Sequence, residues 1–268
     1  MGKIVWLASY PKSGNTWVRA FLHNYIAQPG APYDINALTE FSAVECAAAF
    51  FGPDAGRMTN EDVQRARESV HAALTKLSDD LVFVKTHNAR LVVHKAALCT
   101  PAYTAGAIYI VRDPRDVALS YAAYLGHPID DVIDFMGNEK AANAGDERQV
   151  FELLSSWSAH ARSWAESPGV LLVRYEDLCA APTVHFGRIV KFLGGEAEPE
   201  RLARAIAFSD FRTLSAQEAA NGYQAGGQGG PVFFRAGVGG QWRDVMHPAQ
   251  AQRITRVHGE VMRKFGYL

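Results

Sequence analysis

Four short apolar runs along the chain each end in a polar or charged residue, and they cover residues 4–8, 81–84, 107–111 and 170–173. Runs of this kind are typical of strands buried on both faces of a parallel sheet. After the first run, Trp17, Phe21 and Tyr25 recur at a four-residue spacing, which predicts a helix with an apolar stripe. The alternation predicts a single α/β domain over residues 1–268, with a central parallel β-sheet of about four or five strands flanked by helices.

Other segments have different patterns. Residues 126–149 are polar and turn-rich, and residues 215–232 are rich in glycine and alanine, so we predict that both are mobile and that the second is a loop or lid. Aromatic residues at helical spacing predict a helix over residues 150–164, and Thr59 is expected to begin an earlier helix.

Composition excludes several function classes. The formal net charge of −1 over 268 residues provides no global positive field for a nucleic acid. Cys46, Cys99 and Cys179 lie far apart, so neither a disulfide framework nor a zinc site is indicated, and no ligand cluster suggests another metal. Because no apolar run reaches transmembrane length and the N-terminus is too short for a signal peptide, we expect a cytoplasmic protein without a membrane span.

The segment after the first predicted strand has the features of an anion-binding loop. Gly14 allows the backbone to approach a bound group, Lys12 adds a positive charge, and the start of the following helix favours an anion. The order of residues differs from a Walker A loop, which has Gly-Lys-Ser/Thr after an upstream glycine. On these residues alone, an ordinary turn that binds nothing stays an alternative.

Polar groups at the ends of the next two runs are further candidates for chemistry. Ligands of open α/β sheets bind at the carboxyl ends of strands, so His87 is a candidate general base beside Lys85. A purely structural His87 stays open. Arg112 and Ser120 can hold one phosphate together, although Arg112 could instead pair with a neighbouring Asp.

Taken together, these stretches resemble the family of sulfotransferases that use 3′-phosphoadenosine 5′-phosphosulfate (PAPS), of the cytosolic type and bacterial-like. The matching motifs are Tyr-Pro-Lys-Ser-Gly-x-Thr-Trp at 10–17, Lys-Thr-His at 85–87, Val-Arg-Asp-Pro-Arg-Asp-Val-x-x-Ser-Tyr at 111–121, Arg-Tyr-Glu-Asp-Leu at 174–178, and shorter matches at 209–211 and 235–242. The chain departs from the family pattern at Asn15, Asp210, Ala236 and Gln241. Since Ala236 replaces a lysine of the pattern, weaker binding of the 3′-phosphate is an open question.

The resemblance implies an architecture like that of P-loop kinases and a set of site residues. It assigns catalysis to His87 as general base with Lys12 and Lys85, and donor binding to Lys12, Ser13, Gly14, Asn15, Thr16, Trp17, Arg112, Ser120, Tyr175, Ser209, Phe211, Arg235 and Gly237. Trp17 is expected to stack on adenine, although it could equally be a core residue.

The implied reaction transfers a sulfuryl group from PAPS to a hydroxyl, or to an amine, of a small-molecule acceptor, with 3′-phosphoadenosine 5′-phosphate (PAP) as product and no metal. The alternatives are a non-catalytic protein that binds PAP or PAPS, and an ATP-dependent small-molecule kinase. We expect residues 30–60, 88–95, 121–150 and 215–235 to surround the acceptor, whose identity is left open together with the oligomeric state.

Overall fold

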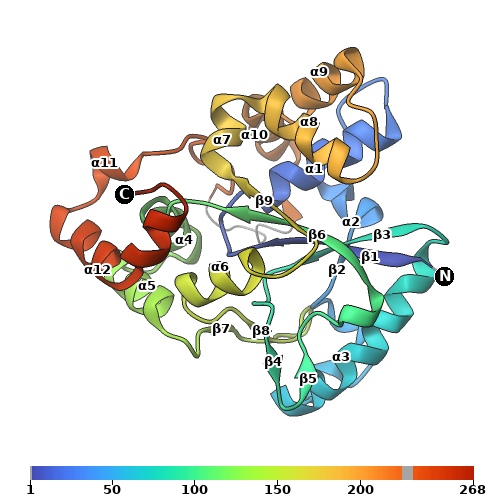
Figure 1. Cartoon of the computed structure of the whole chain (residues 1–268), viewed down its shortest axis with the longest axis horizontal. Helices are drawn as coiled ribbons and strands as arrows, with labels where there is room; N and C mark the ends of the chain where they lie inside the picture. The colour runs from blue at the N-terminus through green and yellow to red at the C-terminus, as the bar shows by residue number, and fades with distance from the viewer. Residues whose placement is uncertain (1, 225–231) are drawn as a thin grey trace.

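A computed structural model describes residues 2–224 and 232–268. Five parallel strands form the central sheet in the order β2 (Ala43–Val44), β3 (Leu81–Thr86), β1 (Lys3–Ser9), β6 (Thr104–Val111) and β9 (Val170–Arg174). The predicted α/β fold with a parallel sheet is therefore confirmed (Figure 1). Two short antiparallel pairs lie outside this sheet: β4 (Val92–Val93) with β5 (Ala96–Ala97), and β7 (Ala142–Asn143) with β8 (Glu152–Leu153).

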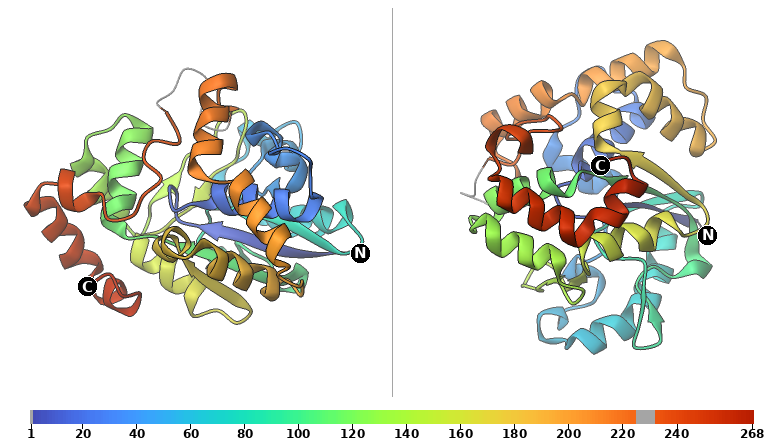
Figure 2. Two further views of the ribbon diagram at one scale, coloured as in Figure 1. Left: turned by 90° about the horizontal axis from the view of Figure 1, so that it is seen from above. Right: turned by 60° about the vertical axis from the view of Figure 1, so that its left-hand side comes forward.

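Helices cover both faces of the sheet (Figure 2). They are α1 (Asn15–Ala27), α2 (Leu38–Phe41), α3 (Asn60–Leu74), α4 (Pro114–Leu125), α5 (Ile129–Gly137), α6 (Trp157–Ala165), α7 (Tyr175–Ala180), α8 (Pro182–Phe192), α9 (Pro199–Phe208), α10 (Phe211–Asn221), α11 (Trp242–Val245) and α12 (Pro248–Lys264). Short turns of 3₁₀-helix join several of them. Thr59 caps α3 as predicted, because its hydroxyl accepts from the Asp62 backbone N–H while the Asp62 carboxylate accepts from the Thr59 N–H.

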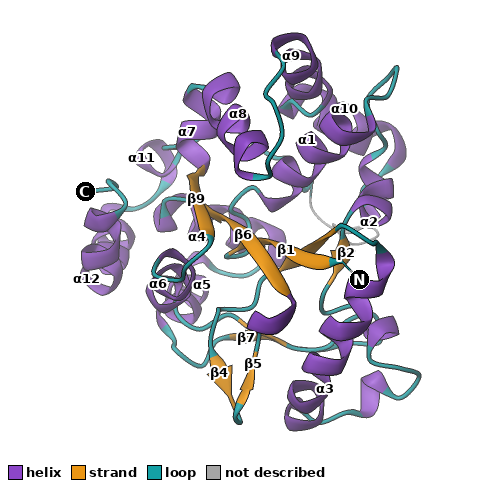
Figure 3. Cartoon of the chain, turned by 45° about the vertical axis from the view of Figure 1, so that its right-hand side comes forward, coloured by secondary structure: helices purple, strands orange, loops and turns teal. Residues whose placement is uncertain are grey.

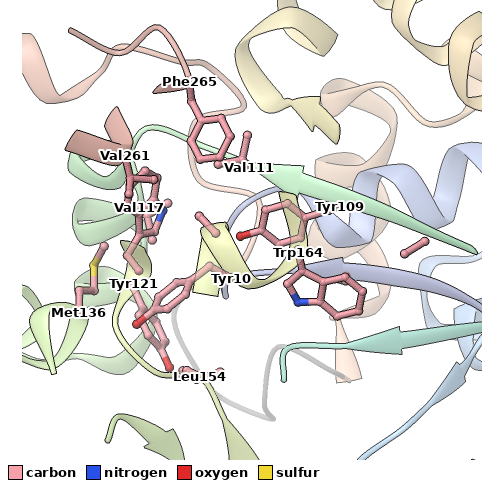
Figure 4. Packing of buried hydrophobic residues seen from close by; sticks show 14 of the residues in the cluster. Tyr10, Tyr109, Val111, Val117, Tyr121, Met136, Leu154, Trp164, Val261 and Phe265 are labelled. Atoms are coloured by element: carbon pink, nitrogen blue, oxygen red, sulfur yellow. The ribbon is translucent and has the colours of Figure 1, made fainter. Parts of the chain in front are cut away.

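Side chains alternate between the two faces of β1 and β6 and so divide the core into two layers. Figure 3 shows helices on either side of the strands. Trp6 and Tyr109 pack with α3, α4, α6 and α12 on one face, whereas Leu7 and Ile108 pack with α1, α8 and α9 on the other. The first layer is rich in aromatic rings: Tyr109 stacks on Trp164 with ring centroids 6.0 Å apart (Figure 4). Both faces of the central strands are thus buried, as their continuous apolar runs predict.

Two predictions about secondary structure need correction. The helix expected over 150–164 begins only at Trp157, because Ser156 caps it and Glu152 and Leu153 are extended in β8. The turn-rich segment 126–149 contains α5, whose Val132, Ile133 and Met136 are buried in the core. The predicted mobility of 126–149 stays a prediction.

The second segment expected to be mobile, 215–232, begins within a helix. Residues up to Asn221 belong to α10, and the Asp210 carboxylate caps this helix by accepting from the Thr213 N–H. The mobility of segment 215–232 stays a prediction, and its residues 225–231 lie outside the described residues.

The register of the sheet brings the predicted site together. Ala8 lies opposite Thr86 on one side and opposite Tyr109 on the other, so the chain segments after β1, β3 and β6 leave the sheet at one edge. In the sheet, β3 lies on one side of β1 and β6 lies on the other. The chain therefore crosses to the opposite side of β1 between these two strands, and ligands of open α/β sheets bind at such a switch point.

Candidate active site

The anion loop, residues 10–17, connects β1 to α1 and is shaped by a left-handed turn. Gly14 has φ 102° and forms the N-terminal cap of α1, and no side chain caps the first backbone amides of this helix. A Cβ placed on Gly14 would lie 2.7 Å from Cδ2 of Tyr175, so glycine is required both by conformation and by space. The free amides and the helix dipole make the start of α1 suited to an anion.

A cavity of about 850 Å³ opens at the carboxyl edge of the sheet and reaches the anion loop. Its volume falls within the range of about 300 to 1,000 Å³ that is usual for small-molecule sites. The predicted site residues that line it are Lys12, Gly14, Asn15, Thr16, Trp17, Lys85, His87, Arg112, Ser120, Tyr175, Phe211, Arg235 and Gly237. Segments from both halves of the chain therefore meet around one cavity.

Two predicted residues, Ser13 and Ser209, do not line the cavity with their side chains. Ser209 is fully buried, and its hydroxyl donates back to the Ala205 carbonyl at 2.8 Å, because the residue follows the last turn of α9. The Ser13 hydroxyl is also buried and has no hydrogen-bond partner among the described residues. The structure thus does not bring the Ser209 hydroxyl to the cavity.

Lys12 lies among aromatic rings within the cavity. Its ammonium nitrogen is 3.4 Å from the centroid of the Phe233 ring and 4.4 Å from that of Tyr124. Burial and then the nearby charge of Arg112 lower the Lys12 pKa to about 7. A bound anion would favour the charged ammonium.

Arg112 connects two distant parts of the site. Its guanidinium donates to the Lys12 carbonyl and to the Val238 carbonyl, each at 3.0 Å, and lies 4.4 Å from the ring centroid of Tyr175. The alternative of an ion pair with a neighbouring Asp is wrong, because Asp113 pairs with Arg115 at 2.7 Å. The buried Nε of Arg112 has no partner in the described parts of the chain.

The segment that carries Arg235 is held by the Asp116 carboxylate and by a contact within the segment. Asp116 accepts from the Gly240 N–H at 2.5 Å and from the Trp242 N–H at 2.9 Å. Gln241, which replaces an Asp of the family pattern, accepts from Arg235 at 2.6 Å. These hydrogen bonds fix the segment beside the cavity, which Arg235 lines.

Glycine is required at position 237 in the same segment. Gly237 has φ 66°, and a Cβ there would lie 2.3 Å from the Phe211 ring.

Trp17 packs as a core residue and also borders the cavity, and its stacking on adenine stays a prediction. Its ring packs edge-on against Tyr175 and Phe186, with centroids 5.7 and 5.3 Å apart, and it also lines the cavity. It is therefore a core residue at the edge of the cavity.

His87 is oriented as a proton acceptor. Its Nδ1 lies 2.7 Å from the Ser9 carbonyl oxygen, which can only accept a hydrogen bond. Nδ1 therefore carries the proton, and Nε2 keeps a free lone pair. Burial and then the charge of Lys85 lower the His87 pKa to about 3, so the ring is neutral near neutral pH.

Sequence reasoning missed two residues that hold His87. Glu152 accepts from the His87 backbone N–H at 2.9 Å and lies 3.5 Å from the Lys85 ammonium nitrogen. Burial raises the Glu152 pKa, but Lys85 and His87 outweigh that effect and bring it to about 2. The Nε2 of His160 lies 3.0 Å from the His87 carbonyl, while its Nδ1 lies 2.9 Å from the Tyr109 hydroxyl. No motif marks either residue.

The acceptor end of the cavity is formed by fewer segments than expected. Residues from 39–50 and 143–152 line it, among them Ala47, Phe50, Asn143 and Arg148, while no described residue of 88–95 does. Segment 88–95 instead leads into the β4–β5 hairpin. Within the described ranges, no group of three His, Cys, Asp or Glu side chains is placed to hold a metal, and no helix there is long and apolar enough to cross a membrane.

Comparison with known proteins decides the family. Residues 3–266 match the sequence model of the sulfotransferase domain. The chain is a member of the sulfotransferase family. Sulfotransferase 2A1 of Rattus norvegicus is 28% identical over 172 residues, which are 59% of this chain and 57% of the rat protein. Sulfotransferase 1A1 of Canis lupus familiaris is 24% identical over 97% of this chain and 83% of its own length. The chain thus spans just over half the length of the first curated sulfotransferases that it matches.

Solved structures show the same sulfotransferase fold. A retinol dehydratase in complex with androsterone and inactive cofactor PAP superposes with a TM-score of 0.63 at 20% identity, over 97% of this chain and 80% of that one. A mouse sulfotransferase complexed with PAP also has a TM-score of 0.63, at 19% identity over 97% of this chain and 84% of the other. The central parallel sheet of this chain is thus that of the sulfotransferases, which is the P-loop kinase-like architecture that the sequence predicted.

Proposed function

We propose that the chain transfers the sulfuryl group of PAPS to a hydroxyl, or an amine, of a small-molecule acceptor. The observation that carries this proposal is one shared cavity, in which the unprotonated Nε2 of His87 and the anion loop with Lys12 face the same space. Membership of the sulfotransferase family and the PAP bound by two structural relatives support the choice of donor.

The residues present fit a donor with two anionic ends. The amides at the start of α1 and Lys12 suit the 5′-phosphosulfate, beside the buried Ser13 hydroxyl, which has no hydrogen-bond partner among the described residues. Arg112, Ser120 and Arg235 suit the 3′-phosphate, and the Nε of Arg112, which has no partner within residues 2–224 and 232–268, remains available there. When bound, the donor supplies a sulfur atom that an oxygen can attack while the 5′-phosphate leaves.

The chain's own residues then perform proton transfer and charge stabilisation. His87 removes the acceptor proton with Nε2, while the Ser9 carbonyl keeps the ring in the required tautomer. Lys12 and Lys85 stabilise negative charge on the transferring group and on the departing phosphate oxygen. This is catalysis by position and electrostatics, as in phosphoryl transfer, and the proposal needs no metal.

Two other functions predict different behaviour. An ATP-dependent kinase on this fold is expected to have a Walker-type loop and to need magnesium, and the sequence lacks that loop. A protein that only binds PAP or PAPS would be expected to lack His87 or Lys12, and both are present.

A ligand comparison and an acceptor screen test the proposal. We expect PAP to raise the melting temperature more than ATP with magnesium does. With PAPS carrying a labelled sulfate, a panel of phenols, alcohols and amines should then yield a labelled product and equimolar PAP. Stabilisation by ATP with magnesium alone would support the kinase, and PAP binding without transfer to any acceptor would support the binding protein.

A further inference from the structure

Glu152 lies at the centre of the cavity wall, although no motif includes it. β8 pairs with β7, and this small ladder holds Glu152 against the end of β3. One carboxylate oxygen, Oε1, contacts both the His87 N–H and the Lys85 ammonium, and the other, Oε2, lies 3.5 Å from Nδ2 of Asn143. The carboxylate therefore touches the backbone of the proposed base and the side chain of the neighbouring lysine at the same time.

Glu152 differs in its surroundings from the other buried glutamate nearby. Glu45 pairs with Arg67 and bonds Asn88 at 2.9 Å, is fully buried, and does not line the cavity. Glu152 is also buried, with 3% of its side chain exposed, but it belongs to the cavity wall together with Lys85 and His87. A role confined to folding accounts for the position of Glu45, whereas Glu152 is placed among the groups that would change charge during a reaction.

The charges of Lys85 and His87 indicate how the Glu152 carboxylate can assist proton transfer. Before the reaction His87 is neutral, and Lys85 and Glu152 form an oppositely charged pair. When the acceptor proton moves to Nε2, the imidazolium that forms lies beside the Lys85 ammonium. Two positive charges in a desolvated wall repel each other strongly, and one negative charge on Glu152 offsets that repulsion.

We propose that Glu152 is a positioning residue of the transfer reaction, which fixes Lys85 and the backbone of His87 and provides the counter-charge for the imidazolium. This inference rests on the proposed function. Glu152 does not take the proton: the proton passes from the acceptor oxygen to Nε2 of His87, the oxygen–sulfur bond forms, the bond from sulfur to the 5′-phosphate oxygen breaks, and the carboxylate keeps its charge throughout.

Two acceptors of different acidity separate this role from a structural one. Phenol has a pKa of roughly 10, like a tyrosine side chain, and needs a base to become a good nucleophile. The much more acidic 4-nitrophenol is already ionised in part at neutral pH and depends less on His87. Loss of the counter-charge therefore penalises phenol more than 4-nitrophenol, whereas a distorted cavity penalises both.

The experiment compares Glu152→Gln and Glu152→Asp with Glu147→Gln, which removes an exposed carboxylate outside the cavity. For Glu152→Gln we expect turnover with phenol to fall at least tenfold and turnover with 4-nitrophenol to fall less than threefold, with PAP affinity within threefold of the wild type. Glu152→Asp should recover part of the phenol activity, and Glu147→Gln should match the wild type. Equal losses with both acceptors, or no loss with phenol, would overturn the inference.

Failure of the proposed function gives a different result, because the wild type would then transfer sulfate to neither phenol nor 4-nitrophenol. In that case hydrogen exchange at the His87 amide in Glu152→Ala still tests the positioning. Faster exchange than in the wild type, with the rest of β3 unchanged, is expected from loss of the 2.9 Å bond. An unchanged exchange rate would show that Glu152 does not hold His87.

Discussion

The anion loop and the cavity wall satisfy their polar groups in opposite ways. The wall is defined as Lys85, His87 and Glu152, which line the cavity, together with the buried His160 that bonds the His87 carbonyl. In the loop, the buried Ser13 hydroxyl, Asn15 Oδ1 and Trp17 Nε1 have no hydrogen-bond partner among the described residues. In the wall, the N–H, the Nδ1 and the carbonyl of His87 are all bonded, to Glu152, Ser9 and His160.

This difference predicts separate roles for the anion loop and the wall. Buried polar groups without partners cost about 1 to 3 kcal/mol each, so the loop gains most from a ligand that supplies partners. The wall residue His87 is already held by three hydrogen bonds of the protein, and its Nε2 makes none with the described residues. Changes in the loop region should therefore act mainly on nucleotide binding, and changes in the wall mainly on turnover.

The largest effect is expected for His87→Ala, which removes the proton acceptor from the wall. Turnover should fall by roughly 10² to 10⁴, the usual contribution of a general base. PAP affinity should stay within about threefold, because the loop is intact, and titration calorimetry with PAP beside a turnover assay measures both quantities. His127→Ala, at an exposed position, is the matched control. Full activity of His87→Ala would refute the base assignment.

A smaller effect, on binding alone, is expected for Asp116→Asn. The asparagine keeps the shape but turns an amide N–H toward one of the two backbone donors, Gly240 or Trp242, that the carboxylate now accepts from. A lost buried hydrogen bond of about 1 to 3 kcal/mol predicts roughly tenfold weaker PAP binding, because the segment carrying Arg235 loosens. Calorimetry should show unchanged affinity for Asp244→Asn, an exposed control on α11. Equal affinities for all three proteins would mean that this segment does not help to bind PAP.

The smallest effect is a pH dependence of PAP binding that originates in Lys12. Its pKa is lowered to about 7 in the free protein, and a bound anion favours the ammonium, so binding takes up a proton above neutral pH. Affinity should therefore fall roughly fivefold between pH 7 and 8, following proton linkage. Calorimetry in buffers of different ionisation enthalpy detects the uptake, and Lys12→Met should abolish it. Proton uptake that persists in Lys12→Met would assign the effect to another group.

The loop was predictable from sequence and the wall was not, for a physical reason. The loop is one continuous segment in which Gly14, Lys12 and the helix start are neighbours in sequence, so local chemistry determines it. The contact between Glu152 and the His87 N–H joins positions 65 residues apart, and it depends on a two-residue strand, β8, that lies in a stretch where aromatic spacing suggested a helix. At Ser209 the sequence indicated a contact with the donor that the structure does not provide. The residue matches the motif, but its hydroxyl donates to the Ala205 carbonyl of α9.

The two hydrogen bonds of Arg112 have a consequence for the order in which the protein can become active. One guanidinium joins the carbonyl of Lys12, 100 positions earlier, to that of Val238, 126 positions later. Domains fold during synthesis from the N-terminal end, at about 5 to 20 residues per second. The ribosome therefore makes the anion loop more than 200 residues before Val238, and the contact that Arg112 makes between them can form only after residue 238 has been released. A nascent chain interrupted before that point carries the loop but lacks the contact that joins it to the segment bearing Arg235.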